Sequence, residues 1–196
     1  MSNLSSLEIR NFWIRAYLGT TNDSKIKIAS IDRAYRDFNR TLHKIKHTTD
    51  SYQILRNKML SIIDYVEHYQ FKTQKEFDHW HKEKCDELKS DFKKHINYYI
   101  YYGQTQKWIN MSLKYIFAIN YGIPSGYETN YKFFHIPIDN TIQEKFETKR
   151  IERIEGPWSK LDSYKKYLKY QIKIRETFPN QIPMDVEFKI FNEYDT

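Results

Sequence analysis

Residues 108–119 read WINMSLKYIFAI. On a helix through this stretch, apolar and aromatic side chains fall on every side, whereas a surface helix keeps them in one stripe. We therefore expect a central helix that the rest of the chain surrounds. Two polar side chains inside it, Asn110 and Lys114, need a buried partner or a function.

The first hundred residues predict long helices with short joints. Capping-box patterns begin at Ser5 and Thr73, each with a glutamate three residues later. Between these two starts, apolar residues recur every three or four positions over 28–45 and 52–69. We expect one helix from Ser5 to about Leu18, one through 24–45, one through 50–69 and one from Thr73 onward.

The second half predicts shorter helices with structured loops. All five prolines lie in the last 73 residues, and a single glycine precedes Gly103. We expect a helix from Asp139 to about Thr148, and a long helix capped by 156–159 that ends near Phe178. Pro183 is placed in the first turn of a last short helix.

These patterns predict the all-α class. No segment sustains the alternation of a half-buried strand, and 196 residues are typical of one domain. We expect about seven or eight helices around the buried central helix. The single domain, 1–196, then divides into long helices (1–96), a candidate site (97–148) and C-terminal helices (149–196).

Composition restricts the class of protein. Apolar residues are 40% of the chain and aromatic residues 17%, which excludes collagen, disulfide scaffolds and full disorder. One cysteine, Cys85, allows no intrachain disulfide, and no stretch has the length of a signal core or membrane span, so we expect a cytoplasmic protein without a membrane partner. The net charge of +7 fits a polyanion such as nucleic acid, and it fits a lysine-rich composition without a partner equally well.

Two motifs carry candidate chemistry. Residues 98–110, YYIYYGQTQKWIN, read as a helix end, a tight turn with glycine and a new helix. Lys107 falls in the first turn of the buried helix, so it either snorkels outward or lies in a pocket as an amine nucleophile. Downstream, residues 135–142, HIPIDNTI, place Asp139 at a helix N-cap behind a proline that fixes it against the core.

These motifs resemble those of the helix-hairpin-helix DNA glycosylases, including the 8-oxoguanine glycosylase branch. That family has a glycine-containing hairpin, a lysine early in the next helix and an asparagine three residues later, which Gly103, Lys107 and Asn110 match. A downstream V-P-V-D element of the family is matched by residues 136–139, IPID. The resemblance implies that Lys107 attacks C1′ of a damaged nucleotide to form a Schiff base. It also implies that Asp139 stabilises charge at the sugar.

The match to the family is partial. It covers residues 98–142, and Thr105 stands where the family hairpin has a second glycine. Lys107 and Asp139 are 32 positions apart, so the loop over 120–130 would be an insertion. An unrelated helical protein with a surface lysine and an N-capping aspartate is the alternative.

Aromatic rings near the turn would suit an enzyme that extrudes a base and stacks it in a pocket. Backbone N–H groups at a glycine turn before a helix can seat a phosphate. We therefore expect DNA rather than RNA as partner, and neither a metal nor another cofactor. The expected nucleic-acid-binding residues are Tyr101, Tyr102, Gly103, Gln104, Thr105, Trp108, Asn110 and His135.

A second hypothesis rests on two R-x6-H pairs, Arg36 with His43 and Arg40 with His47. They are similar to the motif of HEPN ribonucleases, which are all-α, metal-independent and dimeric. Residues seven apart share a helix face, so these four side chains could act on an RNA phosphate in a dimer cleft. A solvated basic face is the competing interpretation.

A third hypothesis is a helical interaction protein without catalysis, for instance in phage–host conflict. No P-loop, G-x-G-x-x-G or G-x-S-x-G motif supports another enzyme class. His81 and Cys85 are four apart and could share a metal, but no second pair completes a tetrahedral site. The aromatic and acidic segment 184–194, which includes Glu187, either closes the fold or contacts a partner.

Overall fold

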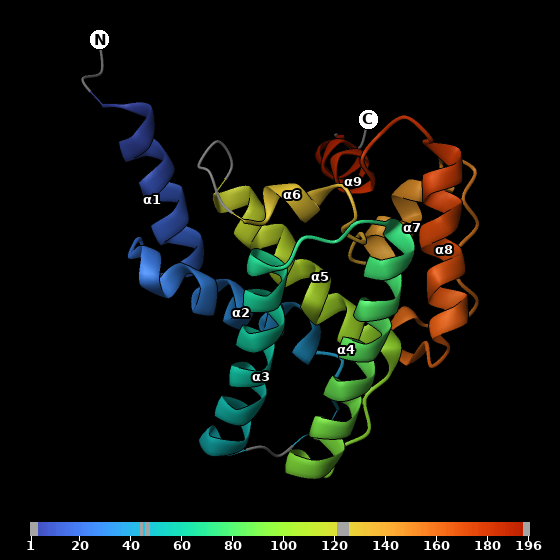
Figure 1. Cartoon of the computed structure of the whole chain (residues 1–196), viewed down its shortest axis with the longest axis horizontal. Helices are drawn as coiled ribbons and strands as arrows, with labels where there is room; N and C mark the ends of the chain where they lie inside the picture. Colours follow the sequence, from blue (N-terminus) through green and yellow to red (C-terminus); the bar gives the residue numbers. More distant parts are fainter. Residues whose placement is uncertain (1–3, 44, 46–47, 121–125, 194–196) are drawn as a thin grey trace.

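The computed structural model describes residues 4–43, 45, 48–120 and 126–193, with the backbone alone at Asp23. These residues form helices and connecting segments without a strand, which confirms the all-α prediction (Figure 1). In chain order the helices are α1 (Ser6–Leu18), α2 (Asp23–Asn39), α3 (Thr49–His68), α4 (Gln74–Ile96), α5 (Tyr102–Ile119), α6 (Glu128–Tyr131), α7 (Asn140–Glu147), the 3-10 helix η1 (Trp158–Lys160), α8 (Tyr164–Thr177) and α9 (Pro183–Asn192).

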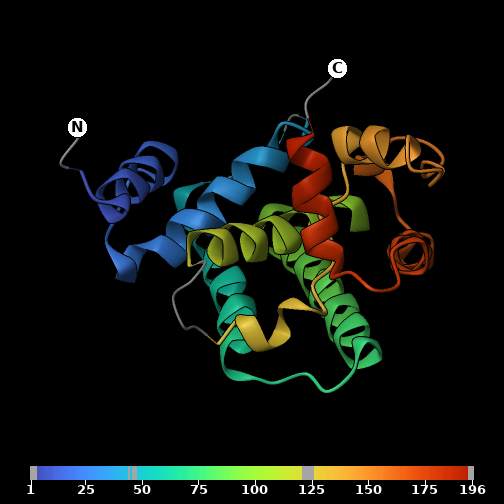
Figure 2. The same cartoon turned by 90° about the horizontal axis from the view of Figure 1, so that it is seen from above.

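The expected central helix is α5. Every residue from Gly103 to Lys114 is buried, so the helix has no solvent-facing side over three turns. It packs against α2, α3, α4, η1 and α8 (Figures 1 and 2). Helices far apart in the sequence therefore share one core around α5.

Local capping signals place several helix ends correctly. Ser5 and Glu8 form the expected capping box at α1, and the side chain of Thr73 caps α4. Asp139 caps α7 through its own side chain, and Pro183 is the first residue of α9. Each of these starts depends on hydrogen bonds or backbone angles within a few residues, which a sequence pattern records.

Helix α2 ends earlier than its apolar spacing predicts. The expected helix ran through Ile45, but α2 stops at Asn39. The hydroxyl of Thr41 donates to the carbonyl of Phe38 at 2.6 Å, and the side-chain amide of Gln104 donates to the Thr41 hydroxyl at 3.0 Å. A contact from α5 thus holds the turn, and no glycine or proline in the sequence marks it.

Helix α5 begins earlier than expected, so Gly103 lies inside its first turn rather than in a hairpin. A Cβ atom at this position would lie 1.8 Å from the backbone oxygen of Trp158, and the Gly103 N–H donates to the carbonyl of Leu161 at 3.0 Å. Glycine is needed here because η1 passes directly against the helix. This replaces the interpretation of Gly103 as a turn residue.

The helix expected from 156–159 begins later than predicted. Residues 158–160 form η1, and the side chain of Ser163 caps α8 at Tyr164. The end of α8 at Thr177 agrees with the prediction. Among the described helices, none combines the length and the apolar character needed to cross a bilayer.

Candidate functional site

The two sequence motifs meet through side-chain amides of α5. Gln106 donates to the carbonyl of Ile138 at 2.8 Å and accepts from the Ile138 N–H at 3.1 Å. One turn later, Asn110 donates to the carbonyl of Ile136 at 3.1 Å. These two side chains bind the extended segment 135–139 much as a neighbouring strand would, and they satisfy the carbonyl of Ile136 and both backbone groups of Ile138.

The same segment is held from its other side by α8. Gln171 donates to the carbonyl of Ile136 at 2.9 Å and accepts from the Ile136 N–H at 3.2 Å. The amides of α5 and α8 therefore fix the position of residues 135–138 in the core. Asp139 follows this fixed segment directly, which limits where its carboxylate can lie.

Asp139 divides its two carboxylate oxygens between two tasks. Oδ1 accepts from the backbone N–H of Ile142 at 2.9 Å, which caps α7. Oδ2 accepts from Lys107 Nζ at 2.5 Å. The Lys107 side chain is 5% exposed and the Asp139 side chain 19%, so the pair is largely, but not fully, withdrawn from water. The structure thus brings together the two residues that the resemblance singled out as catalytic.

A second buried ion pair lies two turns along α5. Lys114 Nζ lies 2.7 Å from Oε1 and 2.6 Å from Oε2 of Glu187 on α9. Burial raises the pKa of the Glu187 carboxyl, and the charge of Lys114 opposes that rise. The rings of Phe188 and Phe191 each lie 4.7 Å from Lys114 Nζ, within the range of a cation–π contact.

Both ion pairs line one pocket between α1, α2, α5, α7 and α9. Its volume is about 580 Å³, within the range of small-molecule sites. The lining residues are Tyr17, Asp37, Arg40, Lys107, Met111, Lys114, Tyr115, Ala118, Asp139, Ile142, Glu187, Phe188, Phe191 and Asn192. Paired charges that line a cleft are a frequent property of functional sites.

The two ion pairs differ in how the carboxylate is engaged. Asp139 contacts Lys107 with one oxygen and caps α7 with the other, so its carboxylate is held in a fixed position beside the Lys107 amine. Glu187 contacts Lys114 with both oxygens. A lysine amine that loses its proton can act as a nucleophile, and Lys107, on the pocket wall, is the candidate for that role.

The expected phosphate seat is occupied from within the protein. The Gly103 N–H donates to Leu161, and the N–H groups of Gln104 and Thr105 donate to the carbonyl of Tyr101. Gly103, Gln104 and Thr105 are also buried. These backbone groups are therefore closed to a phosphate in this structure.

The expected stacking rings lie away from the pocket. The Tyr102 hydroxyl donates to Asp86, and Lys89 Nζ lies 4.0 Å from the Tyr102 ring centre. Tyr101 is half-buried, and Trp108 is fully buried with its indole N–H on the carbonyl of Ile31. The rings that line the pocket come instead from α1, α5 and α9.

His135 lies in a buried polar network. Its Nε2 lies 2.7 Å from Asp78 Oδ1, and its Nδ1 lies 2.9 Å from the Tyr167 hydroxyl. Burial lowers the pKa of His135, and it lowers the pKa of His81 still more. Burial alone would raise the pKa of Asp78, but its bonds to His135 and the charge of Arg175 lower it to about 2.

This network continues to the site helix. The side-chain amide of Asn110 donates to the hydroxyl of Tyr167 at 2.9 Å. Its Oδ1 atom lies 3.0 Å from Nε2 of His81. His81 contacts the hydroxyl of Tyr164 at 2.9 Å with its other nitrogen. Asn110 and His135, expected at the nucleic acid, are thus internal groups that position segment 135–139.

Arg36 and His43 do not share a helix face. Arg36 and Arg40 are exposed near the end of α2, and His43 lies beyond that end. His47 lies outside the described residues. The shared-face argument for a HEPN-like site was therefore wrong for Arg36 and His43, because α2 ends at Asn39. Of the described residues of these two pairs, Arg40 lines the pocket.

His81 and Cys85 do not form a metal site. Their Nδ1 and Sγ atoms lie 3.7 Å apart, and both residues are fully buried. Burial raises the pKa of the Cys85 thiol to about 12, which disfavours the thiolate that binds metals. Within the described part of the chain, no group of three or more histidine, cysteine, aspartate or glutamate side chains could hold an ion.

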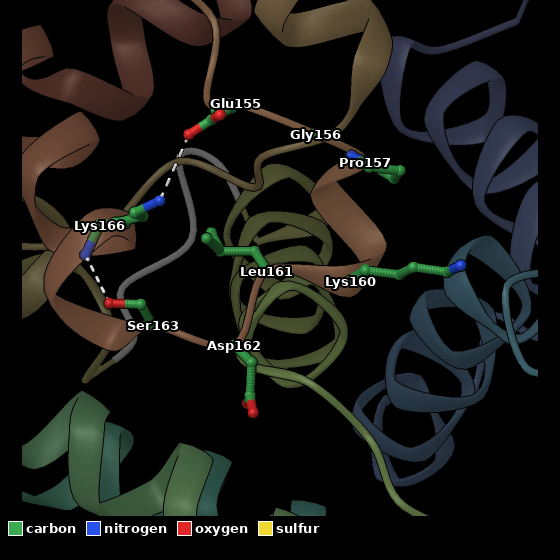
Figure 3. A pocket seen from close by; sticks show the side chains of 8 residues that line it. All are labelled: Glu155, Gly156, Pro157, Lys160, Leu161, Asp162, Ser163 and Lys166. Atoms are coloured by element: carbon green, nitrogen blue, oxygen red, sulfur yellow. Dashed lines mark hydrogen bonds and ion pairs between the residues drawn. The ribbon is translucent and has the colours of Figure 1, made fainter.

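Two other hollows lie on the surface beside α8. One, of about 330 Å³, contains the ion pair between Lys166 and Glu155 at 3.6 Å, with side chains 62% and 91% exposed (Figure 3). The other, of about 870 Å³, lies between α8 and residues 150–155. The charges of the Figure 3 hollow are solvated rather than buried, unlike those of the pocket on α5.

Sequence reasoning missed the role of the α5 amides and the partner of Lys114. Gln106 was not singled out, and Glu187 was named without a role. A usable signal exists in the spacing of Gln106, Lys107, Asn110 and Lys114, which places polar groups along one side of an otherwise apolar helix. Comparison with known proteins identifies no relative: no family model, no curated protein and no solved structure matches this chain.

Proposed function

We propose that the chain is a DNA-processing enzyme of the glycosylase and lyase type, in which Lys107 is the nucleophile and Asp139 its proton acceptor. The observation that carries this proposal is their contact at 2.5 Å on the wall of a pocket, across 32 residues of sequence. Both residues sit in motifs that resemble the lysine and aspartate motifs of helix-hairpin-helix glycosylases.

The pocket suits an extruded nucleotide. Its volume of about 580 Å³ is within the range of small-molecule sites, and Tyr115, Phe188 and Phe191 offer ring faces or edges to a base. Arg40 at the pocket and the net charge of +7 favour a phosphate backbone. These features favour nucleic acid as partner, and a flipped deoxynucleotide as the group that enters.

The proposed reaction uses the ion pair in three steps. Lys107 first passes a proton to Asp139 and becomes a neutral amine. Its nitrogen then attacks C1′ of the sugar, the N–C1′ bond forms, and the base leaves with the electron pair of the glycosidic bond. Asp139 returns its proton to the departing base.

The sugar product is then a Schiff base. The nitrogen bound to C1′ loses one proton to the ring oxygen O4′ as the ring opens, which leaves an iminium ion. Addition of water to that iminium releases the sugar aldehyde and regenerates the Lys107 amine. Each proton that leaves one group in this sequence is accepted by another, and no oxidant is needed.

Borohydride trapping on duplex DNA with one abasic site tests the proposal. Borohydride reduces a Schiff base to a stable amine, so the wild-type chain should become covalently attached to labelled DNA. Lys107→Ala should abolish the adduct, while Lys166→Ala, an exposed lysine on α8, should leave its yield unchanged. Absence of an adduct with the wild-type chain, or an equal yield with Lys107→Ala, would contradict the proposal.

A further inference from the structure

Helix α1 contacts the rest of the described chain through one narrow face. Ile14 is its buried residue, and Arg10, Asn11 and Leu18 are half-buried around it. The helix packs against α2, and the guanidinium of Arg10 donates to the carbonyl of Ile119 on α5. Figure 1 shows α1 extending away from the other helices towards its N-terminal end.

The face of α1 opposite Ile14 is apolar. At 100° per residue, Ile9, Phe12, Trp13 and Ala16 form one stripe on that face. The exposed fractions of Ile9, Phe12 and Trp13 are 47%, 63% and 65%. A surface helix normally carries charged or polar side chains on the face that points to solvent. An apolar stripe on that face of α1 therefore departs from the usual pattern.

The size of the stripe is typical of a functional surface. Phe12 and Trp13 pack edge to face with ring centres 5.2 Å apart, so they present one continuous apolar unit. With Ile9 they expose roughly 350 Å² of apolar surface, on the basis of the full areas of such side chains. The largest apolar patch on a single soluble chain typically covers roughly 300–600 Å² and is often functional.

We propose that α1 is a dimerisation helix, which pairs in antiparallel orientation with α1 of a second copy of this chain. The stripe is symmetric about a point between Phe12 and Trp13. A twofold axis through that point places Phe12 against Trp13 of the second copy, and Ile9 against Ala16 of the second copy. Ile9 of each copy then faces the small side chain of Ala16, while the rings of Phe12 and Trp13 pack together at the axis.

The charges beside the stripe are complementary in the same orientation. Glu8 and Arg15 lie seven residues apart on one flank of α1, and both are exposed. Reversal of one helix relative to the other brings Glu8 of each copy to the Arg15 end of its partner. A parallel pair would instead place this flank of the two copies on opposite sides of the interface, so Glu8 would not meet Arg15 of the partner.

These charges favour a second copy over a lipid surface. Helices that lie in membrane interfaces have a lysine- and arginine-rich polar face. The described cations of α1 are Arg10 and Arg15, and Arg10 is directed to the carbonyl of Ile119. One helix per copy covers less than the roughly 800 Å² per partner of a standard interface, so we expect a reversible dimer.

Sedimentation equilibrium of the full chain tests this interface. The wild-type chain should pass from monomer to dimer over roughly the micromolar to hundred-micromolar range. Phe12→Glu with Trp13→Glu should remain monomeric throughout, with helical circular dichroism at the wild-type level. Ile172→Glu, at an exposed position on α8, is the matched control and should dimerise like the wild type.

A charge exchange tests the orientation. Glu8→Lys and Arg15→Glu should each raise the dimer dissociation constant by about fivefold, because each puts like charges together. An equimolar mixture of these two variants should dimerise again, because each mixed pair restores two opposite-charge contacts. Glu8→Gln controls for the capping bond that the Glu8 side chain accepts from the Ser5 N–H, since the side-chain oxygen of glutamine can also accept it.

Three results would overturn the proposal. The first is a wild-type chain that stays monomeric at all of these concentrations. The second is a Phe12→Glu, Trp13→Glu variant that dimerises like the wild type. The third is binding to phosphatidylcholine–phosphatidylglycerol vesicles that this variant loses, without a wild-type dimer. None of these results bears on Lys107, so dimerisation and the proposed enzyme activity stand or fall separately.

Discussion

Gln106 and Ile138 exchange two hydrogen bonds, one from the side-chain amide to the backbone carbonyl and one from the backbone N–H to the side-chain oxygen. The first residue belongs to the central helix and the second to the segment that carries Asp139. Lys107 follows Gln106 and Asp139 follows Ile138, so one amide aligns both members of the ion pair. A side chain of the central helix therefore positions the site, through the two hydrogen bonds that a neighbouring β-strand would otherwise make with Ile138.

Gln106→Leu should lower the free energy of unfolding by about 2–4 kcal/mol, because the buried N–H and carbonyl of Ile138 lose their partner. Urea unfolding followed by circular dichroism measures the change. Gln181→Leu, at an exposed glutamine, should change the same quantity by less than about 0.5 kcal/mol. Equal stabilities for the two variants would show that the amide does not hold the segment.

Lys114→Met should destabilise the fold by about 3–5 kcal/mol at pH 7.5, because Glu187 would remain buried without its counter-charge. The loss should shrink at pH 5.5, since a carboxyl whose pKa is raised by burial can then take up a proton. Glu187→Leu in the Lys114→Met background should recover most of the stability at pH 7.5. Thermal melts of the single and double variants distinguish this from a simple packing defect, which would show no pH dependence.

Gly103→Ala should destabilise the fold by about 1–3 kcal/mol, because the new methyl group would meet the backbone oxygen of Trp158 at 1.8 Å. Gly19→Ala provides the comparison. Gly19 has a φ angle of 79°, and a Cβ atom added there would meet no other atom within 4 Å. The Gly19→Ala destabilisation of about 1 kcal/mol should therefore arise from backbone strain alone. Amide hydrogen exchange should become faster at the start of α5 in Gly103→Ala and stay unchanged there in Gly19→Ala.

The buried histidines predict a loss of stability as the pH falls. Burial lowers the pKa of His81 and His135 in the folded chain, while the unfolded chain retains values near 6.5. The unfolded state therefore binds more protons below pH 6.5, and the free energy of unfolding should fall by about 1–3 kcal/mol between pH 7 and pH 5. Asp78, with a pKa of about 2, contributes to acid sensitivity only below about pH 4.

Urea unfolding at pH 7, 6 and 5 measures this dependence. His81→Gln should flatten it, because one of the two groups that take up a proton on unfolding is removed. His79→Gln, at a histidine with a 74% exposed side chain, should leave the slope unchanged. A wild-type stability that is constant from pH 7 to pH 5 would contradict the assignment of neutral buried rings.

Helix type and several helix starts could be predicted because their causes are local. Ser5, Asp139 and Pro183 act on backbone groups within four residues of themselves, and the apolar character of 108–119 predicts burial directly. The ends set by tertiary contacts could not be predicted. The amide of Gln104 helps to end α2 from another helix, and no residue near that end records the contact.

The features of the site also divide into those set by the local sequence and those set by contacts with distant residues. The N-cap position of Asp139 follows from its own sequence, whereas the turn and phosphate seat expected at Gly103 depended on where α5 begins. That start is fixed by η1, some fifty residues later in the chain. The partner of Lys114 could not be inferred because Glu187 lies 73 residues away, and long-range pairs leave no periodic signal.

Peptide mapping of the borohydride adduct by mass spectrometry identifies the residue that reacts with the sugar. Lys107 alone should carry the reduced sugar, and Asp139→Asn, which keeps a capping side chain at α7, should lower the adduct yield at least tenfold. A sugar on Lys114, or adducts spread over exposed lysines, would contradict the assignment of the Lys107–Asp139 pair as the reacting groups.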